Sequence, residues 1–248
     1  MSLRIHLIIS AVIAVAFVVI VQVFASPLPV FRFLLPAFLV YLVVVSLYNR
    51  WYMRKQNRWN VWVWLRLPMF LASWFGVFFL LPSSFARGLF LLALVPVTFF
   101  FESLVGNIGQ QLGWNEFLLT LGASLITLFG FSYYFLLPGL VYLMLTFLAV
   151  AVIVRSSLEL VPHSNIVKWV ASLAIGLFAL ELFWGINFLP LHYTALAVVT
   201  FNVLYVVWIV YYHYLYHTLT RKQIQFHLVL AIILTIVIFL STPWSIQT

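Results

Sequence analysis

Long apolar runs, separated by short polar, proline or glycine breaks, extend along the whole chain. A hydrocarbon core about 30 Å thick needs about 20 apolar residues per helix, and each run has roughly this length. The runs are continuous and do not alternate with polar residues, which excludes the strands of a membrane β-barrel. Nine transmembrane helices are predicted, at approximately 5–25, 30–49, 61–82, 86–105, 116–136, 139–158, 166–188, 192–216 and 224–243.

The breaks between these runs leave no room for a soluble domain. The longest break, about 50–60, is far shorter than the roughly 50 residues that a small domain needs. The chain is therefore predicted to be an all-α polytopic integral membrane protein, a helical bundle that forms a single transmembrane domain over 1–248.

The basic residues predict an orientation, because Lys and Arg are enriched on the cytoplasmic side of membrane proteins. With the N-terminus inside and the C-terminus outside, ten basic residues lie on the cytoplasmic side and two, Arg32 and Arg87, lie outside. The ten are Arg4, Arg50, Arg54, Lys55, Arg58, Arg66, Arg155, Lys168, Arg221 and Lys222. The loop 107–115 is the weak point, because it is cytoplasmic in this topology and has no Lys or Arg. We expect a multi-pass protein of the cytoplasmic membrane.

The first run allows a second interpretation. Arg4, the apolar run and the small residues at Ala25 and Ser26 have the order of a signal peptide. The run is about 18 residues long, however, and a signal peptide usually has 7–15 apolar residues. We expect a retained first helix. Cleavage would instead leave eight spans and an N-terminus outside.

Composition narrows the class further. Apolar residues make up 66% of the chain and charged residues 6%, against about 25% charged in an ordinary soluble domain. The formal net charge of +8 could indicate nucleic-acid binding in a soluble protein. In a chain this apolar, the basic residues flank spans and contact anionic lipid headgroups. We therefore expect the bilayer as a partner, with partner membrane subunits or a second copy as further possibilities, and no nucleic acid.

Several mechanisms are excluded because their residues are missing. The four acidic residues are all glutamates, and the chain has no aspartate and no cysteine. Intramembrane aspartyl proteolysis, aspartate-rich diphosphate binding, thiol redox chemistry and iron–sulfur clusters therefore cannot be built here. The sequence also lacks a zincin motif and a glycine-rich phosphate loop. No cofactor is predicted, and an enzymatic role is not favoured.

Glu181 is the strongest candidate for a functional residue, because it lies well inside the seventh span. Counting back from Pro190 at 1.5 Å per residue places it about 10–14 Å from the outer end of the helix. A carboxylate at that depth costs at least about 2.5 kcal/mol unless it is paired, protonated or hydrated. It either lines a polar path and carries a proton or cation, or fastens helices by pairing with Arg32 or Arg87.

Two weaker features accompany Glu181. Pro96 lies near the middle of the fourth span and marks either a broken helix beside a cavity or a packing kink. The segment Glu102-x3-Gly106-Asn107 resembles Glu181-x3-Gly185-x-Asn187, which is either a faint inverted repeat or a chance match. Asn187 is a further candidate for a polar path.

Arg66 and Glu102 form a second candidate pair. The third and fourth spans are joined by a tight turn, and both residues lie near the cytoplasmic boundary. They are close enough in this topology to form an ion pair. The alternative is that each side chain extends separately to the lipid headgroups.

Histidines near the cytoplasmic boundary give the third candidate. His213 and His217 share one helical face, and His227 follows at the start of the next span. Together with Glu159 or His163, they could hold a metal ion. The competing interpretation is an interfacial aromatic belt, because tyrosines surround the pair.

Three functions remain open. The first is a small transporter or permease-like protein of unknown substrate, in which Glu181 supplies the coupling or binding charge. The second is a non-catalytic scaffold or assembly subunit that binds partner helices or lipid. The third is a metal-dependent lipid enzyme at the cytoplasmic face that uses His213, His217 and His227.

Overall fold

The computed structural model describes residues 3–25, 33–55, 61–103, 110–135 and 138–242. Within these ranges the chain forms nine α-helices and one short 3-10 helix, and it contains no strand. The chain divides into two compact units, residues 1–116 and 117–248. The prediction of an all-α polytopic bundle is confirmed, and the single transmembrane domain stays a prediction.

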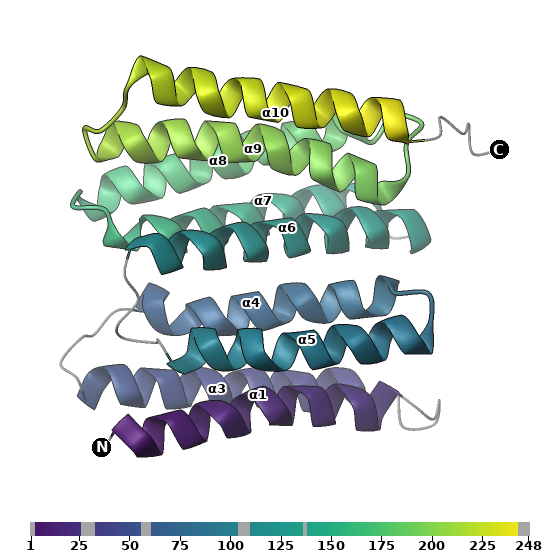
Figure 1. Cartoon of the computed structure of the whole chain (residues 1–248), viewed down its shortest axis with the longest axis vertical. Coiled ribbons are helices and arrows are strands. Elements are labelled where there is room, and N and C mark those ends of the chain that lie inside the picture. The colour runs from purple at the N-terminus through teal and green to yellow at the C-terminus, as the bar shows by residue number, and fades with distance from the viewer. Residues whose placement is uncertain (1–2, 26–32, 56–60, 104–109, 136–137, 243–248) are drawn as a thin grey trace. The chain divides into compact units, whose positions relative to one another are not determined.

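The N-terminal unit is built from four helices that run back and forth (Figure 1). They are α1 (Leu3–Ala25), α3 (Leu34–Lys55), α4 (Val61–Leu80) and α5 (Ser84–Ser103). Helix α1 packs against α3 and α5, and α4 packs against the same two helices. Each helix therefore has two neighbours, and the four enclose a common core.

Aromatic rings fill most of that core. Phe38 stacks on Phe75 with ring centroids 3.8 Å apart, and Phe17 packs edge-on against Phe38. The Tyr41 hydroxyl donates to the backbone carbonyl of Ile13, at 2.8 Å, so its polar end is satisfied inside the apolar core. Helix α1 supplies fully buried residues such as Phe17 to this core, and its retention in the mature protein stays a prediction.

The C-terminal unit begins within α6 and contains five long helices. They are α6 (Gln110–Tyr134), α7 (Gly139–Ser157), α8 (Asn165–Ile186), α9 (Tyr193–Leu215) and α10 (Arg221–Ser241), with the 3-10 helix η1 (Leu158–Leu160) after α7. Helices α7 and α8 form the most extensive contact, and α8, α9 and α10 then follow one another (Figure 1). A Cβ at Gly176 would lie 2.9 Å from the Cβ of Ala151, so glycine is what lets α7 and α8 approach so closely.

Side-chain caps fix where several helices begin. The Ser83 hydroxyl accepts from the backbone N–H of Ala86 at the start of α5, and Ser164 accepts from Val167 at the start of α8. Thr220 and Gln223 form a capping box at the start of α10. These caps satisfy N–H groups that have no partner inside the helix.

The helices agree with the predicted spans to within a few residues at most ends, and the second and fifth spans are the main exceptions. The fifth span, predicted to begin at residue 116, begins at Gln110, and the second differs at its end. Predicted to end at residue 49, it runs to Lys55, so the start of the predicted polar break is helical. Pro96 lies inside α5, which continues through it from Ser84 to Ser103. The interpretation of Pro96 as a helix break is therefore wrong, because the helix passes the missing N–H without interruption.

Eight of the described helices are long and apolar enough to cross a membrane, and α4 contributes a shorter apolar stretch, Trp64–Leu80. Large apolar side chains cover the outer faces, and α10 has no buried residue among those described. A surface of this kind is stable only in contact with lipid or with other helices. The chain is a multi-pass integral membrane protein, and its orientation stays a prediction.

Candidate functional site

Buried polar side chains gather at one end of the N-terminal unit, and each of its four helices contributes at least one. The buried members are His6 of α1, Asn49 of α3, Arg66 of α4, and Thr98 and Glu102 of α5, together with Glu116, the last residue of this unit. We call these six residues the N-terminal polar cluster. Polar and charged groups are rare inside membrane bundles, because each must be compensated there.

Asn49 and Glu102 form the centre of the cluster. The buried residues of α3 include Tyr41, Val45 and Asn49, spaced four apart, so the helix turns the amide of Asn49 into the core. Its Nδ2 donates to Oε2 of Glu102 at 3.2 Å, and both side chains are 0% exposed. The amide is neutral, so this hydrogen bond satisfies one carboxylate oxygen but does not neutralise its charge.

His6 lies against the last turn of α5, beside the backbone of Glu102. Its Nδ1 is 2.8 Å from the hydroxyl of Tyr48, and its ring stacks on Tyr52 at a centroid distance of 3.9 Å. The ring also lies beside the backbone carbonyl groups of Glu102 and Ser103 in the last turn of α5. The cluster thus has an aromatic wall on the side of α1 and α3.

Arg66 and Glu102 both lie in the cluster, but the hydrogen bond of Glu102 goes to Asn49. The Arg66 guanidinium attracts the Glu116 carboxylate electrostatically. The Glu116 carboxylate also interacts electrostatically with that of Glu102. Arg66 is 4% exposed and Glu102 0%, which excludes the alternative in which both side chains extend separately to lipid headgroups. The sequence had not indicated Asn49, His6 or Glu116 as partners.

Glu181 lies on the exposed face of α8, at the same side as Leu177 and Trp184. Within the described part of the chain, it forms no hydrogen bond or ion pair. Of its two predicted partners, Arg87 donates from Nε to the carbonyl of Leu81 at 3.0 Å and packs over the ring of Phe78. Arg32 lies outside the described residues.

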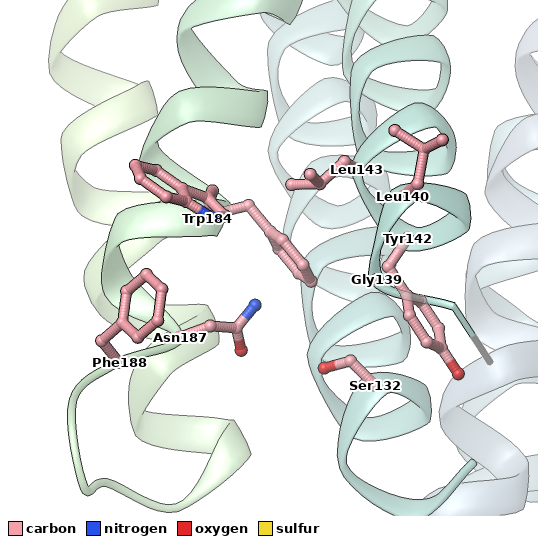
Figure 2. A pocket seen from close by; sticks show the side chains of 9 residues that line it. Ser132, Gly139, Leu140, Tyr142, Leu143, Trp184, Asn187 and Phe188 are labelled. Carbon is pink, nitrogen blue, oxygen red and sulfur yellow. The ribbon is translucent and has the colours of Figure 1, made fainter. Parts of the chain in front are cut away.

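Asn187 caps the end of α8 and lines a cavity of about 440 Å³ in the C-terminal unit (Figure 2). Trp184 and Tyr142 form part of its wall, and none of the described residues that line it is charged. The Tyr142 hydroxyl donates to the carbonyl groups of Phe131 and Phe135, and Ser132 donates to Phe129, so these hydroxyls are already engaged. The cavity therefore suits an apolar group, such as a lipid chain, better than an ion.

The suggested inverted repeat matches Glu102 with Glu181, but the two glutamates differ in burial. Glu102 is fully buried in the bundle core, whereas Glu181 is exposed on α8. Gly106 and Asn107, the other matched residues of the first segment, lie outside the described residues. The two placements give the repeat no support.

The three candidate metal-binding histidines have separate partners. His213 Nδ1 is 2.9 Å from the hydroxyl of Thr218, and His227 Nδ1 is 2.9 Å from that of Tyr205. The ring of His217 lies 6.1 Å from that of His163. Across the ranges that the structure describes, no three histidine or acidic side chains are placed to hold a metal ion.

A second group of buried charges lies in the C-terminal unit. Arg155 Nη1 is 2.6 Å from Glu159 Oε2, and Lys168 Nζ is 3.9 Å from Glu159 Oε1. Arg155 also donates to Asn165 at 3.2 Å, and Lys168 donates to the backbone carbonyl of Glu159 at 3.0 Å. We call these four residues the C-terminal ion-pair cluster. Glu159, considered above as a metal ligand, is held here between two cations.

No protein-family model, no curated protein and no solved structure matches this chain. The chemistry of the two clusters is therefore the basis for a functional conclusion.

Proposed function

We propose that the protein binds a small cation or a proton in the core of its N-terminal unit and moves it across the membrane, with Glu102 as the carboxylate that carries it. The observation that supports this proposal is the environment of Glu102. It is fully buried in a predicted span, and its hydrogen bond comes from a neutral amide.

Charge counting supports the same conclusion. With both carboxylates ionised, the N-terminal polar cluster contains two negative charges, Glu102 and Glu116, against one positive charge, Arg66. A buried charge that lacks compensation is strongly unfavourable, so the cluster favours one additional positive charge. A proton or a monovalent cation supplies that charge and could leave again, as a transport cycle requires.

This proposal retains the transport hypothesis and changes its central residue. Glu181 is exposed on α8 and does not line the cavity of that unit, whereas Glu102 lies among other polar groups. A polar path needs several such groups in contact, because a single carboxylate in an apolar helix face cannot hydrate an ion.

The test is cation uptake into proteoliposomes that contain the full chain. Wild-type protein should acidify or load the vesicles in response to an imposed gradient, and Glu102→Gln should abolish the uptake. Glu181→Gln is the matched control, because it removes a carboxylate from a candidate span outside the N-terminal polar cluster, and it should retain uptake. Equal uptake in wild-type and Glu102→Gln vesicles would contradict the proposal.

The exposed position of Glu181 favours a second candidate function, that of an assembly subunit. A carboxylate in an otherwise apolar, outward-facing helix surface is compensated if a neighbouring helix supplies a cation. If the protein is an assembly subunit, a partner transmembrane helix packs against the exposed face of α8. This face contains Leu177, Glu181 and Trp184, and the partner helix supplies one Lys or Arg at the depth of Glu181.

A designed single-span helix with one central arginine tests this candidate. When it is reconstituted with the protein, energy transfer between labels should report association with wild-type protein and a loss of association with Glu181→Gln. The same helix with leucine in place of arginine is the control. Association that is identical for all three pairs would eliminate this candidate.

A further inference from the structure

Among the buried oxygen atoms of the N-terminal polar cluster that make no hydrogen bond in the part of the chain that the structure describes, three belong to residues of α3 and α5. They are Oδ1 of Asn49, Oγ1 of Thr98 and Oε1 of Glu102, and all three side chains are 0% exposed. Buried polar atoms almost always have a partner, and leaving one without costs free energy. Three such atoms from neighbouring residues indicate a common partner.

Thr98 is unusual among the buried hydroxyl groups of this protein. Inside the other helices, Ser10, Thr146 and Thr200 donate to the carbonyl four residues earlier, at 2.8–2.9 Å. This is the ordinary arrangement for a hydroxyl in an apolar helix. The Thr98 hydroxyl does not make this bond, so its oxygen stays available to a ligand.

The three oxygens share one region of the bundle. Thr98 and Glu102 are four residues apart on α5, so they lie on the same face of that helix. Asn49 reaches Glu102 from α3 through its Nδ2, and the Oδ1 of the same planar amide therefore stays beside the carboxylate. Two helices thus supply an amide oxygen, a hydroxyl oxygen and a carboxylate oxygen.

These donors identify the ligand by chemistry. Amide, hydroxyl and carboxylate oxygens are preferred by hard cations such as Na⁺, Mg²⁺ and Ca²⁺. With both carboxylates ionised and His6 neutral, Arg66 against Glu102 and Glu116 leaves one negative charge in the cluster, which matches a monovalent cation. We infer that Asn49, Thr98 and Glu102 form a binding site for a small alkali cation, represented by Na⁺. This inference rests on the proposed function and names its ion.

The experiment measures the thermal unfolding midpoint of the purified full-length protein as NaCl replaces choline chloride at constant ionic strength. A ligand that binds the folded state raises the midpoint as its concentration increases. Wild-type protein should show a saturable rise with Na⁺. Thr98→Val should weaken Na⁺ binding at least tenfold, and Glu102→Gln should remove the response.

Thr146→Val is the matched control, because Thr146 is equally buried but its hydroxyl donates to the carbonyl of Tyr142. It should bind Na⁺ as the wild type does. In choline alone, Thr98→Val should not lower the midpoint, because its hydroxyl has no partner to lose. A wild-type midpoint that is the same in Na⁺ and choline, or equal Na⁺ responses in Thr98→Val and Thr146→Val, would overturn the inference.

Radioactive Na⁺ binding to the purified protein separates this inference from the transport proposal. Binding that is saturable and lost in Thr98→Val supports the site, even when vesicles show no uptake, and that result would overturn transport alone. Proton uptake that requires Glu102, together with no Na⁺ binding, would overturn the cation site and leave the transport proposal standing.

Discussion

Each unit holds a glutamate near a helix end, and the two carboxylates are compensated differently. In the C-terminal unit, Glu159 has Arg155 at 2.6 Å and Lys168 at 3.9 Å, so its carboxylate faces two cations. In the N-terminal unit, Glu102 receives a hydrogen bond from the neutral amide of Asn49, at 3.2 Å. Glu102 is 0% exposed and the Glu159 side chain 14%, so both are largely shielded from solvent, and their electrostatic environments differ.

This difference separates a structural role from a binding role. A carboxylate between two cations is already compensated, and bringing in another cation would break existing ion pairs. A carboxylate beside an amide accepts a hydrogen bond, but its negative charge is not neutralised. It can therefore bind a cation without losing an ion pair. We therefore propose that the C-terminal ion-pair cluster stabilises the contact between α7 and α8. The N-terminal polar cluster is the proposed binding site.

The largest expected effect is a loss of unfolding free energy when the C-terminal ion-pair cluster is changed. Arg155→Met removes one of the two cations around Glu159 and leaves a largely shielded carboxylate whose remaining cation, Lys168, is 3.9 Å away. Breaking a buried ion pair by removing one partner costs about 3–5 kcal/mol of unfolding free energy, and the remaining lysine places this variant near the lower end. Denaturant unfolding of the purified protein in detergent measures the loss.

The double variant Arg155→Met/Glu159→Gln is the control for this prediction. It removes both charges of the pair, so it should recover part of the lost stability. A single variant that loses less than about 1 kcal/mol, the value of a surface pair, would show that the cluster does not hold α7 to α8.

A smaller effect is expected in the N-terminal unit. Asn49→Leu keeps the branched shape of the side chain and removes the hydrogen bond to Glu102, which leaves a buried carboxylate oxygen without a donor. Such a change costs about 1–3 kcal/mol. Asn202→Leu is the matched control, because Asn202 is also buried but its hydrogen bond to Thr235 is long, at 3.5 Å. Equal losses of unfolding free energy in the two variants would show that the hydrogen bond from Asn49 to Glu102 contributes no more than that of Asn202.

The helices could be predicted from the sequence because continuous apolar runs of about 20 residues have one solution in a bilayer. The depth and rotation of individual side chains could not. Asn49 was assigned to the end of a span, whereas α3 continues to Lys55 and turns this residue inward. The spacing of Tyr41, Val45 and Asn49 along one helix face is the signal that could have identified it.

The ion pairs show the same limit of sequence analysis. Arg155 and Glu159 are four residues apart, a spacing that allows an ion pair, but their burial depends on how closely α7 and α8 pack. Glu181 was the leading candidate because its depth is readable from the sequence. Its exposure on α8 depends on the helix rotation, which an almost uniformly apolar helix does not reveal.

The smallest effect is expected at Glu181. Because Glu181 makes no hydrogen bond or ion pair among the residues that the structure describes, Glu181→Leu should change the unfolding free energy of the purified chain by less than about 0.5 kcal/mol. The same unfolding assay measures it. A loss above about 1 kcal/mol would place Glu181 in an internal contact and weaken its assignment to a docking face.

The most direct test of the account replaces Glu102 and Glu159 in parallel. Glu102→Gln and Glu159→Gln make the same chemical change, and each variant is measured for unfolding midpoint in choline chloride and for cation uptake in proteoliposomes. The account predicts a Glu102→Gln protein that keeps its midpoint and loses uptake, and a Glu159→Gln protein with a lower midpoint that retains uptake after reconstitution. A Glu102→Gln protein that loses as much stability as Glu159→Gln and retains uptake would contradict it.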